Sequence, residues 1–476
     1  MPRQFFHHPD GVLNVHSMST TAAPGADAPA SAAGPAAENS RGRVVVASLV
    51  GTSIEFYDFY VYATAAVLVF PALFFPNAQD PTTQLLSSFA VFGVAFVARP
   101  LGSIVFGHFG DRVGRKATLV ASLLTMGVAT VLIGLIPPAA TPGWAVAAPA
   151  ALVLCRFAQG LGLGGEWSGA ALLATENAPE GKRAIWGTFP QLGAPIGFIL
   201  ANTAFIGLAA ALTPEQFSSW GWRVPFLASA ALVIVGLWVR LKLIETPAFR
   251  KVQEADAVVT VPLARVFRTS WKQLISGTFI MLATYVLFYL MTTFTLTYGT
   301  KPVAPEDGSP GGLGYERVEF LWMLILGVVF FGIFTVVSGP LAERFGRRKH
   351  LIAVTLAIIV FGGLFVPLFS AGTVGVQSLL ILGFVLMGLT FGPMAAVLPE
   401  LFAANVRYTG SAVAYNVSSI LGAAVAPFVA VWLWAQADGS PVLVGVYLSV
   451  MSVLTLVALI IEKETKHVDY TENTGV

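Results

Sequence analysis

Hydrophobic residues fall into twelve long runs that are separated by short polar connections. A helix that crosses a lipid bilayer needs about 20 mainly apolar residues, and each of these runs reaches that length. The pattern predicts an all-α membrane protein with twelve spanning helices. The predicted spans cover residues 44–71, 84–106, 117–137, 145–170, 184–211, 223–243, 272–298, 317–338, 350–370, 376–398, 408–435 and 441–461.

The composition excludes a soluble protein. Apolar residues make up 56% of the chain, charged residues 11%, and the mean hydropathy is +0.76, whereas soluble domains carry about 25% charged residues. The net charge of +2 is spread over separate connections, so we expect a lipid bilayer and no nucleic acid as partner. The single Cys155 and the scattered histidines predict no disulfide within the chain, no metal and no cofactor.

Positive charge gathers in every second connection. Nearly all of the 27 Lys and Arg residues lie in the connections after spans 2, 4, 6, 8 and 10 or in the terminal segments. The positive-inside rule then predicts a multi-pass protein of the plasma (inner) membrane with both termini in the cytoplasm. The exceptions are Arg99 and Arg156 within spans and Arg223, Lys301 and Arg317 in the opposite connections.

A ten-residue motif occurs twice. Residues 107–116 (GHFGDRVGRK) return as residues 339–348 (GPLAERFGRR), which indicates a duplicated bundle of the kind that places a solute site between its halves. Met18 is a second candidate start of the chain. The predicted parts are a disordered cytoplasmic tail (1–40), an N-terminal six-helix bundle (41–243), a cytoplasmic linker (244–271), a C-terminal six-helix bundle (272–461) and a cytoplasmic tail (462–476).

A second repeated pattern, a Glu followed seven residues later by an Arg, supports the duplication. Glu176 and Arg183 flank the connection after span 4 as Glu400 and Arg407 flank the one after span 10. We interpret these charges as ion pairs that lock the cytoplasmic side, the alternative being loop charges placed by topology alone. The predicted cytoplasmic gate comprises Arg99, Gly107, Asp111, Arg112, Gly114, Arg115, Glu176, Arg183, Glu343, Arg344, Arg347, Glu400 and Arg407.

These features resemble the major facilitator superfamily from about residue 41 to 466. Within it, several strings are similar to the metabolite:H⁺ symporter family, which includes proline/betaine, shikimate and 2-oxoglutarate permeases and proteins known only as putative inner-membrane metabolite transporters. The strings are residues 54–59 (IEFYDF), 99–102 (RPLG), 156–160 (RFAQG), 164–167 (GGEW), 222–226 (WRVPF) and 245–247 (ETP).

Ionisable residues inside spans are functional candidates, because burying them is costly unless they are paired. The resemblance to sugar/H⁺ symporters implies that Asp58 on span 1 faces Arg156 on span 4. Separating the two would load a proton onto Asp58, since a nearby cation favours the ionised carboxylate. The alternative is a static ion pair that holds two helices together.

The other buried charges keep several roles open. Glu55 and Glu166 remain candidates for the titrating site, a substrate contact or a partner of Arg99. We expect Arg99, near the cytoplasmic end of span 2, to act as a gate or packing anchor rather than as a substrate ligand.

Neutral polar side chains supply the rest of the predicted cavity. With Arg156 as its deep cation, and no deep Lys or Arg in the C-terminal half, a monocarboxylate or zwitterion fits better than a dicarboxylate. Aromatic residues in membrane helices also serve as plain packing. The predicted substrate residues are Tyr62, Gln159, Tyr285, Tyr289, Tyr415 and Asn416.

The sequence therefore predicts a monomeric secondary transporter that imports a small polar metabolite with protons by alternating access, the proton gradient being its energy source. An H⁺-coupled exporter of the same fold is the first alternative, and a transport-inactive sensor is the second. An enzyme is not expected, because no nucleophile–base arrangement or metal cluster is apparent.

Overall fold

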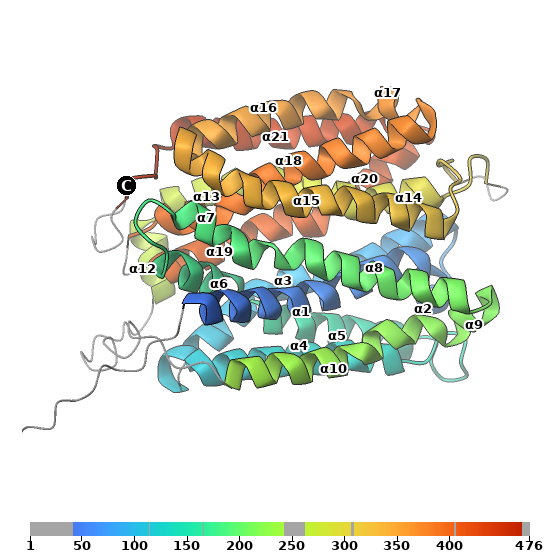
Figure 1. The fold of residues 1–476 in the computed structure, drawn as a ribbon. Coiled ribbons are helices and arrows are strands. Elements are labelled where there is room, and N and C mark those ends of the chain that lie inside the picture. The colour runs from blue at the N-terminus through green and yellow to red at the C-terminus, as the bar shows by residue number, and fades with distance from the viewer. Residues whose placement is uncertain are drawn as a thin grey trace, which may run out of the picture. The chain divides into compact units, whose positions relative to one another are not determined.

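The structure is a computed structural model in which the described residues are helical, with no strand among them (Figure 1). The predicted tail 1–40, Gly114, most of the predicted linker and the last eight residues lie outside the described residues. Of the linker, the short helix α12 (Pro262–Thr269) is described. The described ranges are 41–113, 115–164, 166–241, 262–305, 309–403 and 406–468.

Each predicted span corresponds to one helix or to consecutive helices joined at a break. In the described part of the chain, nine helices are long and apolar enough to cross a membrane. The other three spans coincide with α1, with the apolar stretch Val120–Leu135 of α4 and with α16. The N-terminal half contains α1 (Arg41–Leu68), α2 (Phe70–Phe74), α3 (Pro81–Val113), α4 (Arg115–Leu135), α5 (Ala147–Leu163), α6 (Glu166–Glu176), α7 (Arg183–Gln191), α8 (Gly193–Ala211), α9 (Pro214–Ser219), the 3₁₀ turn η1 (Gly221–Arg223) and α10 (Val224–Leu241).

The C-terminal half repeats this arrangement, with π-helical turns in two of its spans. Such turns are rare and occur often at functional sites. Here one follows Tyr289 and the other follows Ser419. The elements are α13 (Trp271–Tyr289), η2 (Leu290–Phe294), α14 (Thr295–Thr300), α15 (Arg317–Phe345), α16 (Arg347–Gly363), α17 (Phe365–Phe369), α18 (Gly372–Glu400), α19 (Arg407–Ser419), η3 (Ile420–Ala424), α20 (Val425–Gln436) and α21 (Val442–Ile461).

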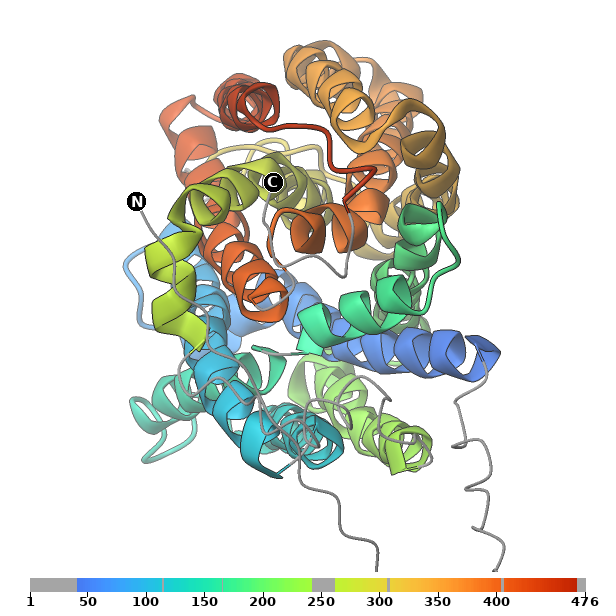
Figure 2. The same cartoon turned by 90° about the vertical axis from the view of Figure 1, so that its left-hand side faces the viewer.

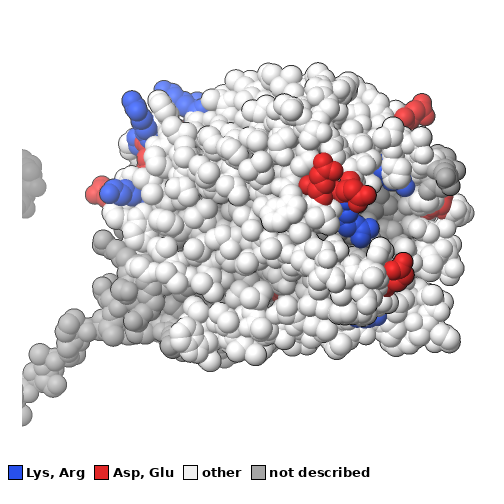
Figure 3. All heavy atoms as spheres, turned by 45° about the vertical axis from the view of Figure 1, so that its right-hand side comes forward, with Lys and Arg blue, Asp and Glu red and all other residues white. Residues whose placement is uncertain are grey.

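The sides of the helix bundle are apolar. Leu154, Ile234 and Val360 leave 69%, 67% and 66% of their surface exposed, and Figure 3 shows a broad uncharged surface with charged side chains toward its two ends. Soluble monomers rarely expose apolar patches larger than a few hundred Å². This surface therefore fits a lipid environment.

Close packing of α3 against α5 depends on glycine. A Cβ atom at Gly160 would collide with the Ala95 carbonyl, and one at Gly164 would collide with the Arg99 carbonyl. Small residues allow membrane helices to approach in this way. This contact sets the position of the α3 segment that carries Arg99.

The two halves meet along several helix pairs. Within the compact unit 39–476, α7 packs on α15 and α18, α8 packs on α15, and α3 packs on α19 and η3. Figure 2, which looks along the helices, shows the blue to green N-terminal helices beside the yellow to red C-terminal ones. The cavity described below lies along this boundary.

Candidate functional site

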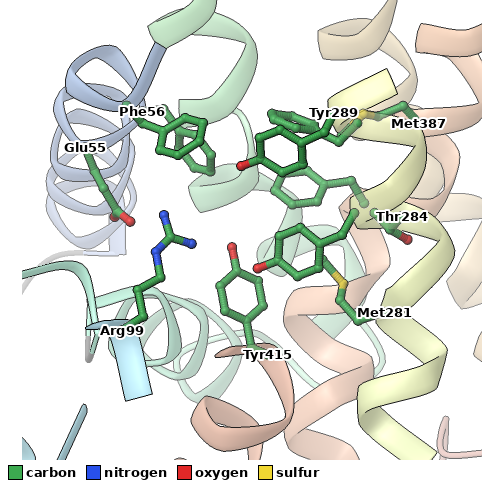
Figure 4. A pocket seen from close by; sticks show the side chains of 12 residues that line it. Glu55, Phe56, Arg99, Met281, Thr284, Tyr289, Met387 and Tyr415 are labelled. Atoms are coloured by element: carbon green, nitrogen blue, oxygen red, sulfur yellow. The ribbon is translucent and has the colours of Figure 1, made fainter. Parts of the chain in front are cut away.

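A small cavity lies between the two halves (Figure 4). Helices α1 and α3 form its N-terminal wall, and α13, α18 and α19 form its C-terminal wall. The lining residues are Glu55, Phe56, Phe59, Arg99, Met281, Thr284, Tyr285, Phe288, Tyr289, Met387, Phe391 and Tyr415.

Both charged residues of this lining come from the N-terminal half. The Glu55 carboxylate on α1 and the Arg99 guanidinium on α3 point toward one another across the cavity (Figure 4). The Arg99 guanidinium carbon also lies 4.6 Å from the ring centre of Phe96 and 5.7 Å from that of Phe59. Arg99 was predicted to be a gate or packing residue, and the structure places its side chain in the cavity lining, packed against these aromatic rings.

The opposite wall is aromatic and neutral. Tyr285 and Tyr289, one turn apart on α13, stack with ring centres 6.5 Å apart, and Tyr415 on α19 lies 5.3 Å from Tyr285. Figure 4 shows the hydroxyl groups of Tyr289 and Tyr415 directed toward Arg99. The structure therefore brings three of the four predicted tyrosines into the cavity wall. Their hydroxyl groups can donate and accept hydrogen bonds, while their rings cover apolar parts of a solute.

Asp58 lies beside the cavity, deep among α1, α4 and α10, and is 1% exposed. Its carboxylate accepts a hydrogen bond from Thr130 Oγ1 at 3.1 Å and another from Ser229 Oγ. Arg156 on α5 is fully buried, and its Nη1 donates to Gln159 Oε1 at 2.9 Å.

The expected direct pair between Asp58 and Arg156 is not formed in this conformation. Gln159 Nε2 donates to Thr130 Oγ1 at 2.7 Å, so two neutral side chains stand between the carboxylate and the guanidinium. Arg156 instead lies over the Tyr62 ring, 4.0 Å from its centre, and its Nε donates to the Phe92 carbonyl at 3.4 Å. Tyr62 and Gln159, predicted to line the cavity, therefore surround Arg156.

Asn416 is also displaced from its predicted place. Its Nδ2 donates to Ser103 Oγ at 2.9 Å and to the Gly164 carbonyl at 3.0 Å, which ties α19 to α3 and to the break after α5. This amide joins the two halves and is not among the residues that line the cavity.

Further contacts close the same region. Trp167 stacks on Tyr415 with ring centres 3.8 Å apart, and its Nε1 donates to Gln191 Oε1 at 2.9 Å. Gln191 Nε2 in turn donates to the Phe391 carbonyl at 2.7 Å. Glu166, next to Trp167 at the start of α6, is 4% exposed and lies outside the cavity lining.

The C-terminal copy of the repeated motif builds a charge cluster. Arg347 Nη1 lies 2.7 Å from Glu343 Oε2, and its Nη2 lies 3.2 Å from Glu400 Oε1. Glu343 Oε1 also accepts a hydrogen bond at 2.7 Å from the backbone N–H of Ala184, in the first turn of α7. A helix N-terminus is a favourable place for an anion, so this carboxylate joins the two halves.

Three other predicted gate residues have the following contacts. Glu400 pairs with Arg347, because the Arg347 guanidinium sits between two carboxylates. Arg344 is exposed over the Phe345 ring. Arg183 Nη1 donates to the Val468 carbonyl at 2.6 Å.

The N-terminal copy of the motif is described only in part. Gly107 and Asp111 lie in the last turns of α3 with Arg112, and Arg115 begins α4; their side chains, and Gly114, lie outside the described residues. Glu176 ends α6 at an exposed position, and Arg407 begins α19 and is 5% exposed.

Sequence reasoning missed the phenylalanine, methionine and threonine part of the cavity lining, which includes Phe56 and Phe59, and a group near the C-terminal end of the described residues. Phe56 and Phe59 follow Glu55 on α1 and line the cavity with it. Their closeness to Glu55 along the helix could have predicted that they share its surroundings. The second missed group is the C-terminal segment that contains Glu464 and Thr465. Thr465 Oγ1 donates to Glu400 Oε2 at 2.7 Å, and Glu464 accepts hydrogen bonds from the backbone N–H groups of Arg347 and Arg348. No periodicity marks such a segment, because it is short and polar.

Comparison with known proteins identifies the family of the chain. The Major Facilitator Superfamily model matches residues 49–427. The inner membrane metabolite transport protein YhjE of Escherichia coli (strain K12) is 58% identical over 431 residues, which cover 90% of this chain and 96% of that protein. The shikimate transporter of the same organism is 34% identical over 432 residues, covering 89% and 95%.

A solved structure supports the fold. The proton:xylose symporter XylE of E. coli superposes with a TM-score of 0.71 at 17% identity, covering 91% of this chain and 97% of that one. At this identity the likeness concerns the fold alone. The relatives are transporters and not enzymes, and the apolar helices agree with a multi-pass protein of the inner membrane. The chain therefore belongs to the major facilitator superfamily, in which it is a metabolite transporter.

Proposed function

We propose that the protein is an H⁺-coupled symporter that takes up a small metabolite with one carboxylate, or a zwitterion, by alternating access between its two halves. The observation that carries this proposal is the cavity, where Glu55 and Arg99 face neutral aromatic residues of the other half. Its further support is the family and the buried carboxylate of Asp58 next to that cavity.

In this proposal Arg99 binds the substrate carboxylate. A guanidinium presents parallel N–H donors that match the two oxygens of a carboxylate. Glu55 would receive a cationic or hydrogen-donating end of the solute, and the hydroxyl groups of Tyr285, Tyr289 and Tyr415 would complete its hydrogen bonds. Arg99 thus replaces Arg156 as the predicted cation, because Arg156 is enclosed by Gln159 and aromatic rings. One cation favours one carboxylate.

The contacts between the halves would form the cytoplasmic gate. Asn416, the Trp167–Tyr415 stack and the Glu343 bond to α7 all join the halves, from the cavity wall at Tyr415 to the repeated motif at Glu343. With both termini in the cytoplasm, as the Lys and Arg pattern predicts, breaking these contacts would open the cavity inward. Protonation of Asp58 would accompany that change.

The test is uptake into proteoliposomes with an inward proton gradient, using radiolabelled shikimate, proline, glycine betaine, 2-oxoglutarate and short monocarboxylates. We expect accumulation of at least one probe with a single carboxylate. Asp58→Asn should abolish accumulation but allow exchange without a gradient, and Arg99→Gln should strongly reduce both. Arg268→Gln, an exposed arginine on α12, is the matched control. Accumulation that persists after the proton gradient is collapsed would contradict the proposal, and gradient-driven loss of probe would favour an exporter.

A further inference from the structure

Thr130 and Gln159 connect the buried carboxylate of Asp58 to the buried guanidinium of Arg156. The connection runs from Arg156 Nη1 to Gln159 Oε1 at 2.9 Å, from Gln159 Nε2 to Thr130 Oγ1 at 2.7 Å, and from Thr130 Oγ1 to Asp58 Oδ2 at 3.1 Å. Thr130 and Arg156 are fully buried, and Asp58 and Gln159 are 1% exposed. Bulk water therefore does not substitute for these bonds.

The Thr130 hydroxyl has two acceptors for its one proton. Besides Asp58 Oδ2, its Oγ1 lies 3.0 Å from the carbonyl of Met126, one turn earlier on α4. A threonine hydroxyl donates one hydrogen bond and accepts two. The Gln159 amide occupies one of its accepting positions, and the other is available to a protonated Asp58.

The same atoms can therefore serve both protonation states. When Asp58 is ionised, Thr130 donates to Oδ2 and Ser229 donates to Oδ1. When Asp58 is protonated on Oδ2, the new O–H donates to Thr130 Oγ1, and Thr130 turns its own proton to the Met126 carbonyl. The hydroxyl groups of Thr130 and Ser229 keep an acceptor in both states, and so does the proton of Asp58, so gain or loss of that proton leaves none of these three groups unpaired.

We propose that Thr130 is a positioning residue for the proton site, which holds Asp58 in both protonation states and, through Gln159, keeps Arg156 apart from it in this conformation. The proposal deepens the proposed function and rests on Asp58 as the proton-binding group. Its consequence is that Arg156 acts on Asp58 through two neutral side chains until a conformational change lets the ions meet.

The surroundings of Asp58 contain few other charges. On α1 the titratable neighbours are Glu55 and Tyr57, and α5 contributes Arg156 behind Gln159. The described side chains of α4 and α10 that pack here, within 120–135 and 224–239, carry no charge and contribute the hydroxyl groups of Thr130 and Ser229. Thr130 is thus well placed to control how strongly the site holds its proton.

The site also touches the cavity. Phe59, the neighbour of Asp58 on α1, lines the cavity and lies 5.2 Å from the Arg156 guanidinium carbon and 5.7 Å from that of Arg99. Movement of α1 that accompanies proton binding therefore reaches both cations through one ring.

The test is an infrared titration of the purified protein in liposomes, which follows the C=O band of protonated carboxyl groups against pH and needs no substrate. The component that Asp58→Asn removes belongs to Asp58. Thr130→Val keeps the shape and removes the hydroxyl, so the midpoint of that component should rise by about one pH unit, because the lost hydrogen bond to the ionised carboxylate is stronger than the lost bond from the protonated carboxyl group. Thr130→Ser should restore the midpoint.

Two further variants separate this role from a general packing effect. Thr295→Val is the matched control, because Thr295 is equally buried and donates to the Met291 carbonyl of its own helix; its midpoint should equal that of the wild type. In the double variant Thr130→Val/Gln159→Leu the shift should match that of Thr130→Val alone, since Gln159 acts through Thr130.

Either of two results overturns the inference. One is a wild-type midpoint in Thr130→Val, and the other is a midpoint shift in the double variant that differs from the shift in Thr130→Val alone. Loss of the shift with Thr130→Ser supports it. If wild-type protein takes up none of the transport probes while the midpoint still moves as expected, the proposed function fails and the role of Thr130 stands.

Discussion

The two halves share one fold but differ in what they bring to their boundary. The N-terminal half contributes Glu55 and Arg99 to the cavity and Asp58 and Arg156 beside it, whereas the lining residues of the C-terminal half are tyrosines, phenylalanines, methionines and one threonine. In the C-terminal half, the two ion pairs of Arg347 lie at the end of the helices.

Because of this difference, the N-terminal half stabilises the buried charges while the C-terminal half presents a neutral surface to them. Ionised groups in a membrane interior are costly unless they are paired or hydrogen-bonded, so gathering them in one half lets one set of helices satisfy them. The other half can then move past them with a neutral surface and leave no charge uncovered. In the proposed transport cycle, this contrast would let the halves move relative to one another without exposing a buried charge.

The largest effect is expected at the charged wall. Arg99→Gln should lower uptake by about 100-fold, because a charge-assisted hydrogen bond contributes up to roughly 3 kcal/mol. Arg99→Lys should restore part of the lost uptake, since lysine restores the positive charge but not the planar guanidinium with its parallel N–H donors. Initial uptake rates in proteoliposomes measure both; equal rates for Arg99→Gln and the surface variant Arg268→Gln would refute this role.

Next comes the carboxylate that joins the halves at the gate. Glu343→Gln weakens both the pair with Arg347 and the bond to the α7 N-terminus, so uptake should fall by about tenfold, equivalent to roughly 1.4 kcal/mol. A cysteine placed at Phe391 should become more reactive toward a cytoplasmic alkylating reagent.

Asp111→Asn, at the matching place in the N-terminal motif, should also reduce transport without preventing membrane insertion. Normal uptake in both Glu343→Gln and Asp111→Asn would remove the gate assignment.

A smaller effect is expected at the neutral wall. Tyr285→Phe and Tyr415→Phe each remove one hydroxyl and keep the ring, so uptake should fall by about threefold to tenfold, as expected for a neutral hydrogen bond of about 1 kcal/mol. The change should appear mainly in the concentration of half-maximal uptake. Losses as large as that of Arg99→Gln would show that the C-terminal half also binds the charged group.

The smallest effect is expected at Arg344. This side chain is exposed, so Arg344→Gln should change the free energy of unfolding of the purified protein by less than about 0.5 kcal/mol. Arg347→Gln, three residues later, leaves the buried Glu400 without its cation and should destabilise by about 3 kcal/mol or more. Similar unfolding temperatures for the two variants would contradict the assignment of Arg347 as the centre of the cluster.

The site could be predicted only in outline. Asp58, Glu55 and Arg156 stood out because charge is rare in apolar helices, and Tyr285 and Tyr289 because one turn separates them. Their partners could not be foreseen. Thr130 and Ser229, which hold Asp58, lie 72 and 171 positions away along the chain, and hydroxyl residues are common in membrane helices.

By itself the sequence determined that the chain is a duplicated helical membrane protein, because apolar length and charge placement follow from the cost of burying polar groups in lipid. Only the tertiary structure decided the direction and partner of each buried side chain. It turned Arg99 into the cavity, placed Gln159 and Thr130 between Arg156 and Asp58, and used Asn416 to join the halves. The physical reason is that helix rotation and packing, rather than spacing along the chain, select which polar groups meet.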